Sequence, residues 1–429
     1  MESLPSAIVD CIQLLRPLFR AEVLTSFSSL MLGILIGEAK YGTARASVFA
    51  GPNYWPQRLS DLFCRHKLSH QAFMAKLVEA ALACLYPTGL PARLLWIADS
   101  TYAEKPYAKR VASIGLFHRT KRVAGQAKHL QGHGYVFAAH LYQHAMATLP
   151  RWASVLVGAL VYVKGRSIPA LVGALAQQLR LPRTVRHVWL VDRGILSRPL
   201  LRTLEGLGHR VVGRVRCNQV VYVAPTAEEG EVVARQRRPR VYGQKCRVDQ
   251  LRSHCPERLR EQKMILRVHG RERIVRLWDT LVLLRGVWRG RALPIRVLVL
   301  VVPGLQLKPW YLLTTDLDLD PRDAVRAYDG RYHIEVNMDE VKELGLGHYQ
   351  GRSGQGIRRW PLFLSLGQMI LKLIATGVLA VPLPRLYWPW YMRENTVGQV
   401  RRRLIEACHP RISCMKVNRP IRRKLAKAA

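Results

Sequence analysis

The stretch RHVWLVDRGILSRP at residues 186–199 has the pattern of a buried strand, a turn and the start of a helix. A short run of mostly apolar residues that ends directly in an aspartate, here Asp192, is typical of a buried strand. Ser197 is suited to cap the helix that follows, and Pro199 is suited to its first turn. The stretch therefore predicts one strand–helix unit of an α/β sheet.

The same pattern occurs earlier in the chain, where LLWIA at 94–98 ends in Asp99. Other apolar runs of strand length are interleaved with stretches of helical period. They predict strands at 134–142, 155–163, 210–216, 295–302 and 310–315, helices at 168–179 and 197–208, and a helical region from 320 onward. Three strands in series followed by alternating helix and strand predict a mixed α/β fold with parallel strands.

Changes in composition divide the chain into five segments. We expect a helical N-terminal domain at 1–88, two parts of an α/β core at 89–218 and 294–380, a β-rich insertion at 219–293 and a basic C-terminal segment at 381–429. The insertion is marked by a basic run and by β-like stretches, which lie at 264–268, 274–278 and 280–285. The core is therefore expected to be interrupted once.

The N-terminal domain contains two short helix-like stretches, WPQRLSDLF at 55–63 and HKLSHQAFM at 66–74. Two short helices joined by a turn are typical of a helix-turn-helix that binds DNA. An ordinary helical bundle fits the same pattern, so both interpretations stay open. Apolar runs at 27–36 and 373–383 predict buried helical segments, because neither is long enough to span a membrane.

The charge balance indicates the class of partner. The 429 residues include 67 Lys+Arg and 29 Asp+Glu, so the formal net charge is 67 − 29 = +38, while 49% of the residues are hydrophobic. The hydrophobic content excludes a disordered polycation. A folded protein of this charge favours a polyanionic partner, and nucleic acid is the first candidate.

The location of the protein is also constrained. The N-terminus lacks the charge pattern of a signal peptide, and no membrane association is expected. The eight cysteines form no CxxC pair, which disfavours a structural zinc site, although Cys408, His409 and Cys414 are a weak candidate. Scattered cysteines suit a reducing compartment, so we expect a soluble cytoplasmic protein, associated with the nucleoid.

The sharpest motif lies in YDGRYHIEVNMDEVK at 328–342. Tyr328, Arg331, Glu335 and Lys342 stand at relative positions 0, 3, 7 and 14, which fall within about 60° of one another on a helix. Such a face can hold a phosphate beside a hard cation. The alternative is an exposed helix with ion pairs, and Gly330 can interrupt that helix and displace Tyr328.

The two strand-end aspartates have two interpretations as well. A carboxylate at the end of a strand in an open α/β sheet is either a functional group, such as a metal ligand, or the cap of the following turn. The cap is the commoner role for each one alone. Because acidic residues are scarce in this chain, the occurrence of both Asp99 and Asp192 favours a functional role.

The spacing Tyr-x2-Arg-x3-Glu-x6-Lys, preceded by two strand-end aspartates, resembles the YREK group of bacterial insertion-sequence transposases, which use a DDE triad. The resemblance covers about residues 90–380. It implies a ribonuclease-H-like mixed-sheet catalytic core, interrupted by the β-rich insertion. Tyr332 stands where tryptophan is common in the group, and Ile195 stands where many relatives have an aromatic residue, so the subgroup is open.

The resemblance also implies a chemistry. Asp99, Asp192 and Glu335 would be the catalytic residues and the metal ligands. They would hold two Mg²⁺ ions, with Mn²⁺ able to substitute, and the ions would promote in-line attack on a phosphodiester. Arg193 and Arg331 would help to keep the carboxylates ionised. Water would first free the 3′-OH at each transposon end, and that hydroxyl would then attack target DNA.

Further residues are expected to contact DNA. Tyr328, Arg331 and Lys342 would bind phosphates near the transposon end, and three arginines near a glycine-rich stretch would extend that contact: Arg352, Arg358 and Arg359. Trp278 and Trp288 are candidates for stacking on a flipped base, although packing in the core is the commoner role of a tryptophan. The expected partners are double-stranded DNA, as terminal inverted repeats and as target, and a second copy of the chain in a homodimer.

Two other functions stay open. A structure-directed nuclease would share the fold and the triad but would not join DNA strands. A domesticated relative would bind DNA without cutting it, although the presence of Asp99, Asp192 and Glu335 argues against that.

Overall fold

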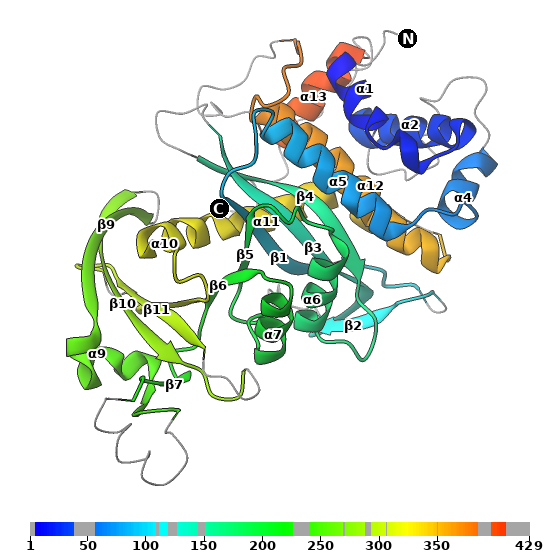
Figure 1. Ribbon diagram of the computed structural model, residues 1–429. Coiled ribbons are helices and arrows are strands. Elements are labelled where there is room, and N and C mark those ends of the chain that lie inside the picture. The colour runs from blue at the N-terminus through cyan, green and yellow to red at the C-terminus, as the bar shows by residue number, and fades with distance from the viewer. Residues whose placement is uncertain are drawn as a thin grey trace, which may run out of the picture.

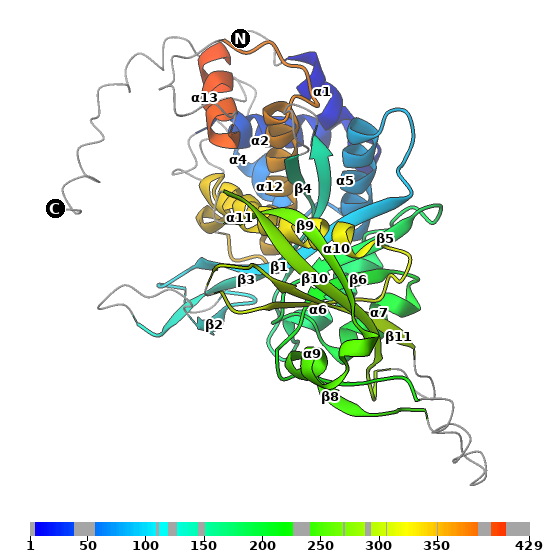
Figure 2. The same ribbon diagram turned by 90° about the vertical axis from the view of Figure 1, so that its left-hand side faces the viewer.

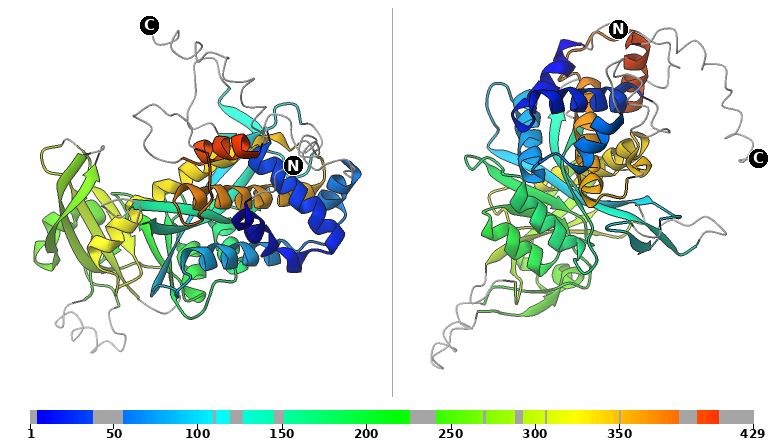
Figure 3. Two further views of the ribbon diagram at one scale, coloured as in Figure 1. Left: turned by 90° about the horizontal axis from the view of Figure 1, so that it is seen from above. Right: turned by 90° about the vertical axis from the view of Figure 1, so that its right-hand side faces the viewer.

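The computed structural model describes residues 5–37, 56–108, 111–118, 127–144, 151–225, 241–268, 271–287, 293–305, 307–349, 351–384 and 396–408. It is a mixed α/β structure built on one large, mostly antiparallel mixed sheet (Figure 1). Seen from above, the N-terminal helices gather at one end and the strands from β7 to β11 at the other (Figure 3).

The first half of the sheet contains the parallel strands that the sequence predicts. Its members are β1 (Arg93–Glu104), β2 (Gly115–His118), β3 (His129–His144), β4 (Arg151–Val161), β5 (Arg186–Val191) and β6 (Arg210–Arg214). β1 runs parallel to β5, and β5 runs parallel to β6. β3 is antiparallel to β1 and pairs with both β2 and β4. Continuous apolar runs suit the inner strands because both faces of the sheet are covered.

The second half continues the same sheet. Its strands are β7 (Val220–Tyr222), β8 (Lys245–Arg247), β9 (Arg260–Val268), β10 (Arg271–Leu283), β11 (Pro294–Val301) and β12 (Trp310–Thr314). β12 joins the two halves, because it pairs with β6 on one side and with β11 on the other. In Figure 2 β9 and β10 lie nearest the viewer, in front of the first half of the sheet, and the N-terminal helices lie at the top.

The β-like stretches predicted at 274–278 and 280–285 are present, but they are not separate elements. One strand, β10, crosses Asp279 without a break, and Asp279 is opposite Leu298 of β11. An aspartate is unfavourable in a buried strand. Here burial raises the pKa of Asp279, and the guanidinium of Arg296, 3.6 Å from the carboxylate, offsets part of that effect.

Helices cover both faces of the sheet. The helices among the described residues are α1 (Ser6–Gln13), α2 (Ala21–Ile36), α4 (Pro56–Cys64), α5 (His70–Leu85), α6 (Ile168–Gln178), α7 (Arg198–Gly206), α9 (Leu251–His254), α10 (Pro321–Asp329), α11 (His333–Glu343), α12 (Gly354–Ala375) and α13 (Val397–Cys408). α6 and α7 lie on one face and α10, α11 and α12 on the other (Figure 1). The predicted cap of α7 is confirmed, since Ser197 Oγ accepts a hydrogen bond from the Leu200 amide.

Short 3₁₀ turns connect several of these elements. They are η1 (Arg16–Leu18), η4 (Val248–Gln250), η5 (Pro256–Arg258), η6 (Gly330–Tyr332) and η7 (Leu346–His348). η6 separates α10 from α11, so the chain from 321 to 343 is not one uninterrupted helix. In the part of the chain that the structure describes, no helix is long and apolar enough to cross a membrane.

The N-terminal helices pack against the core through an aromatic cluster. Phe27 of α2, Phe63 of α4 and Phe73 of α5 each contact Phe363 of α12, with ring centroids 5.3–5.5 Å apart. The helix predicted at 55–63 is present as α4, whereas the one predicted at 66–74 begins only at His70 and continues to Leu85 as α5. The apolar face of α5 is buried among other elements, as in the bundle interpretation of this region.

The interpretation of residues 351–383 needs a correction. The sequence predicts a glycine-rich stretch followed by a helix at 373–383, but α12 begins at Gly354 and ends at Ala375. Ser353 caps its start by accepting from the Gly356 amide. Gly377, with φ at +73°, ends the helical path soon after α12. The glycines in its first turn and a proline in its interior concealed this helix in the sequence.

Candidate functional site

The two aspartates are brought together by the register of parallel strands. In the β1–β5 ladder the last matched pair is Ala98 with Val191, so Asp99 and Asp192 are the next residue on each strand. Neighbouring strands lie about 4.8 Å apart. The sequence predicts that each aspartate stands at a strand end, and the pairing brings the two positions to one edge of the parallel strands.

One detail of that prediction is wrong. Asp99 does not end its strand, because β1 continues to Glu104 and Asp99 is opposite Phe137 of β3. The cause is that β1 has two neighbours of different length. Its pairing with β5 stops at Ala98, while its pairing with β3 continues through six further residues, to Glu104. Asp99 is thus the first residue of β1 that has no pairing partner on the β5 side.

The Asp99 carboxylate is largely buried, with 22% of its side chain exposed. Burial raises the pKa of Asp99, and the nearby charges of Asp192 and Glu335 act in the same direction. The Ser100 amide, 2.7 Å from Oδ1, and the Arg331 guanidinium lower the pKa of Asp99 but do not outweigh burial. The three carboxylates are therefore close enough to influence one another electrostatically.

The glutamate helix approaches these strands through a glycine. Gly330 lies in η6, and a Cβ atom at this position would be 2.9 Å from Leu141 Cδ2 and from Trp152 Cγ. The glycine thus allows the junction between α10 and α11 to pack closely on β3 and β4. The helix is interrupted here, yet Tyr328 is not displaced from the site: its hydroxyl lies 3.5 Å from Asp192 Oδ1.

Arg331 links two of the three carboxylates. One guanidinium nitrogen lies 3.3 Å from Asp99 Oδ2 and the other lies 2.9 Å from Glu335 Oε1. Burial alone would lower the pKa of Arg331, but Tyr328 and the carboxylates outweigh burial and raise it. The side chain of Arg331 is 14% exposed, whereas that of Glu335 is 61% exposed. Arg331 is therefore a fixed cation within the carboxylate cluster.

Other predicted DNA contacts lie near the surface. Arg193, Arg352 and Arg358 are exposed. Lys342 is partly exposed, and its ammonium lies 3.2 Å from Asp339 Oδ1. Lys342 is seven residues after Glu335 on α11, about 10 Å along the helix axis, so it lies on the same face but two turns away from the carboxylates.

Arg359 differs from the expectation. It is buried, and its guanidinium donates hydrogen bonds to the backbone carbonyls of Leu62, Phe63 and His66 at the end of α4. These contacts satisfy carbonyls that α4 leaves unpaired at its C-terminus. Arg359 therefore connects α12 to α4 and is not available to a phosphate.

The two tryptophans have different outcomes. Trp278 is buried, donates from Nε1 to Glu261 Oε2 at 3.2 Å, and has the Arg252 guanidinium 3.9 Å from its ring centroid. The packing interpretation therefore fits Trp278 as it stands in the structure. Trp288 lies outside the described residues, as do His409 and Cys414 of the weak zinc candidate.

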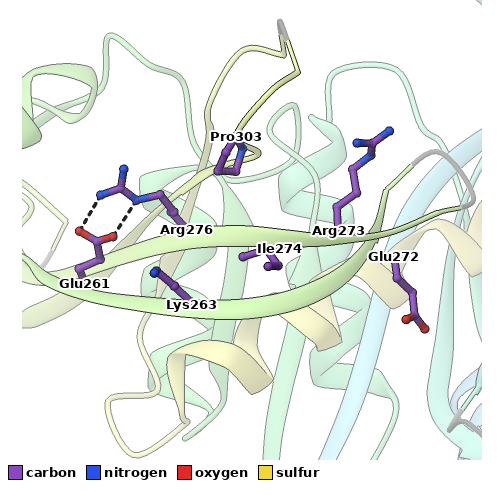
Figure 4. Close-up of a pocket in the computed structure, with 7 residues that line it drawn as sticks. All are labelled: Glu261, Lys263, Glu272, Arg273, Ile274, Arg276 and Pro303. Atoms are coloured by element: carbon purple, nitrogen blue, oxygen red, sulfur yellow. Dashed lines mark hydrogen bonds and ion pairs between the residues drawn. The ribbon is translucent and has the colours of Figure 1, made fainter.

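A pocket lies on the β9–β10 hairpin rather than at the carboxylates. Figure 4 shows the charged side chains around it, among them an ion pair in which Arg276 Nε lies 2.7 Å from Glu261 Oε1. The residues that line it are Glu261, Lys263, Glu272, Arg273, Ile274, Arg276 and Pro303. None of the three carboxylates is among them, so this pocket is separate from the candidate site.

Two cations at the ends of β6 and β1 were missed in the sequence. Arg214 ends β6, one residue after Gly213, which pairs with Val191. Its charge lowers the pKa of Tyr328, although burial raises that pKa to about 12 overall. The end of the predicted strand 210–216, beside the strand that leads to Asp192, was the available signal.

Lys105 is the second such residue. It directly follows β1, and its ammonium donates to the carbonyls of Gly347 at 2.7 Å and Tyr349 at 2.5 Å. These contacts tie the end of the Asp99 strand to the turn after α11. No motif in the sequence indicates so distant a pairing.

The donor chemistry of the site suits a divalent cation, because carboxylate oxygens are the ligands that Mg²⁺ prefers. The geometry does not fit one as it stands. Among the described residues, no three His, Cys, Asp or Glu side chains come together closely enough to hold a metal ion. The guanidinium of Arg331 contacts Asp99 and Glu335 instead.

Part of the chain is similar to a known protein family. Residues 167–366 match the family model described as a transposase DDE domain. The match supports a transposase of the DDE class. It includes Asp192 and Glu335, and it begins after Asp99. No curated protein matches the chain.

Proposed function

We propose that this protein is a DNA transposase of a bacterial insertion sequence, of the YREK group, with Asp99, Asp192 and Glu335 as its catalytic carboxylates. The observation that carries the proposal is their arrangement. Two carboxylates follow matched residues on adjacent parallel strands, and Arg331 joins the third to the first. The match of residues 167–366 to a transposase DDE domain supports the transposase part of the proposal.

The topology supports a ribonuclease-H-like core as part of this proposal. β1, β5 and β6 form its parallel part, and β3 and β4 extend it with antiparallel pairing. The segments 89–218 and 294–380 would be the two parts of this core, with 219–293 as the insertion. Segments 1–88 and 381–429 would be the flanking helical and basic regions.

The proposed reaction is hydrolysis of a phosphodiester at each transposon end, followed by attack of the freed 3′-OH on target DNA. Charge develops on the attacking and leaving oxygens in such a reaction. Arg331 would neutralise part of the charge on the phosphate, and Tyr328 would donate a hydrogen bond. Mg²⁺, with Mn²⁺ as a substitute, is the proposed cofactor. The three carboxylates, all within the described part of the chain, are not grouped to hold it in this structure.

The proposed partners follow from this reaction. They are double-stranded DNA, both terminal inverted repeats and target, and a second copy of the chain, since two ends are processed together. Arg193, Lys342, Arg352 and Arg358 are proposed to contact phosphates. The corresponding location is the nucleoid of a bacterial cell.

The test uses purified full-length protein, DNA that carries the inverted repeats flanking its gene, and Mg²⁺. Asp99→Asn, Asp192→Asn and Glu335→Gln should each lower the rate of nicking by at least about 1,000-fold while DNA binding is retained. Asp323→Asn, on the exposed side of α10, is the matched control and should cut normally. Wild-type nicking rates in all three carboxylate variants would refute the triad.

The same experiment separates the alternatives. Joining of cut 3′ ends to an unrelated plasmid would be expected of a transposase and not of a structure-directed nuclease. A domesticated relative would bind the repeats in a gel-shift assay without nicking or joining them.

A further inference from the structure

A buried polar cluster lies behind the glutamate helix, away from the carboxylates. Its members come from three elements: Ser154 of β4, Asn337 and Glu340 of α11, and Gln368 and Lys372 of α12. Ser154, Asn337 and Gln368 are each fully buried. Polar side chains that are buried so deeply need partners, so their contacts indicate what holds α11 in place.

The cluster begins at an irregularity in the sheet. Ala138 of β3 pairs with Gly158, but the next residue, Ala139, pairs with Leu156, so Val157 is an extra residue in β4. Such a bulge disturbs the local ladder and redirects backbone groups. The Leu156 amide donates to Gln368 Oε1 at 3.0 Å. The side chain of Gln368 is thereby fixed to the strand at the bulge.

The other end of the same amide group is fixed to α11. Gln368 Nε2 donates to Asn337 Oδ1 at 3.0 Å and to Glu340 Oε2 at 2.8 Å. Both amide hydrogens are therefore used, and the amide cannot flip, because a flip would set its oxygen against two other oxygens. Gln368 connects strand β4 and helix α11 through one rigid group.

Two further contacts close the cluster. Asn337 Nδ2 donates to Ser154 Oγ at 2.8 Å, and Ser154 precedes Leu156 by two residues, on the same face of β4. The Lys372 ammonium pairs with the Glu340 carboxylate, and both side chains are nearly buried. α11 is thus bonded to the sheet by Asn337 and to α12 by Glu340.

The position of these bonds around the helix determines what they control. At 3.6 residues per turn, Asn337 lies about 200° and Glu340 about 140° around the helix axis from Glu335. The bonded side of α11 is therefore nearly opposite the side that carries Glu335. Apolar contacts alone would allow a helix small rotations, whereas directional hydrogen bonds on its back define one orientation.

We propose that Gln368 is a positioning residue, which sets the rotation of α11 and so the direction of Glu335 relative to Asp99 and Asp192. The proposal rests on the proposed function, because it takes Glu335 to be catalytic. It assigns the polar cluster a role in activity in addition to its contribution to stability.

The principal variant is Gln368→Met, which keeps the length of the side chain and removes its three hydrogen bonds. We expect the single-turnover nicking rate at saturating DNA to fall about 10- to 100-fold, while the Kd for DNA changes less than about twofold. In a Glu335→Asp background the added effect of Gln368→Met should fall below about twofold, because the carboxylate is already displaced.

Ser365→Ala is the matched control. Ser365 is buried on the same helix, but its hydroxyl bonds within α12, to the Pro361 carbonyl. The control should nick DNA at the wild-type rate. A Gln368→Met protein that nicks at the wild-type rate would overturn the proposal. So would a full additional loss in the Glu335→Asp background, because Gln368 would then act independently of Glu335.

Two further measurements apply if the Gln368→Met protein does not fold or if the wild-type protein does not nick DNA. If Gln368→Met does not fold, Ser154→Ala removes one contact of Asn337 and should lower the nicking rate by about threefold or more; an unchanged rate would refute the proposal. If the wild-type protein nicks no DNA, the proposed function fails. Hydrogen exchange then tests the positioning alone: α11 amides should lose protection in Gln368→Met and keep it in Ser365→Ala, and equal protection would refute it.

Discussion

Acid should destabilise this protein through a buried histidine. His140 lies in β3 with none of its side chain exposed. Its Nδ1 donates to the Leu95 carbonyl at 3.0 Å, so Nε2 carries no proton and accepts from the Tyr86 hydroxyl at 2.9 Å. Burial lowers the pKa of His140 to about 3, and the nearby His187 acts in the same direction. The ring is therefore held neutral in the folded protein.

The size of the effect follows from the two pKa values. Above the unfolded value of 6.5, His140 is neutral in both states and its contribution to stability is complete. Below pH 6.5, His140 becomes protonated in the unfolded chain, but in the folded protein it stays neutral until the pH approaches 3. Between pH 7 and pH 5, His140 alone should lower the free energy of unfolding by about 2 kcal/mol.

The assay is urea unfolding at these two pH values, for the wild type and for His140→Gln. Glutamine retains one donor and one acceptor but does not titrate, so the variant should lose about 2 kcal/mol less than the wild type on acidification. His118→Gln, at an exposed position of β2, serves as the control and should behave as the wild type does. An equal loss in His140→Gln and the wild type would refute the reasoning.

Three further outcomes can be checked. Gly330→Ala should lower the free energy of unfolding by about 1–3 kcal/mol, because its Cβ has no room, whereas Gly206→Ala, with nothing near its Cβ, should not lower it. In thermal unfolding, Arg359→Met should lower the melting temperature by several degrees, since the carbonyls at the end of α4 lose their donor, and Arg358→Met should leave it nearly unchanged. Arg331→Met should raise the pKa of Asp99 further in an NMR titration, since the guanidinium lowers that pKa; an unchanged or lower value would contradict the ion pair.

The parts of this structure that depend on local pattern were predictable from the sequence. The strand ending before Asp192, the capped helix after it and the spacing of Tyr328, Arg331 and Glu335 each follow from residues close together in the chain. The strand that leads to Asp99 was predictable in the same way, whereas the adjacency of Asp99 and Asp192 is seen from the pairing of β1 with β5.

Features that depend on distant partners could not be predicted. The local sequence around Arg359, a glycine-rich stretch, predicts a cation at the surface. The contact of Arg359 with the end of α4 depends on the tertiary fold. The role of Gln368 could not be predicted either, because its partners, the bulge in β4 and the side of α11 opposite Glu335, are distant in the sequence. The pattern of α12 was concealed by Pro361 and by the glycines of its first turn, where local preference opposes a helix that tertiary packing stabilises.

The aromatic contacts of the N-terminal helices limit the replacement of this region by recombination between genes. A recognition module on a linker can be replaced by recombination without regard to the rest of the protein. Here Phe27, Phe63 and Phe73 all pack on Phe363 of α12, so a foreign N-terminal region would leave that ring uncovered unless it carried matching side chains. The two regions are therefore expected to be inherited together, and changes in one to be accompanied by changes in the other.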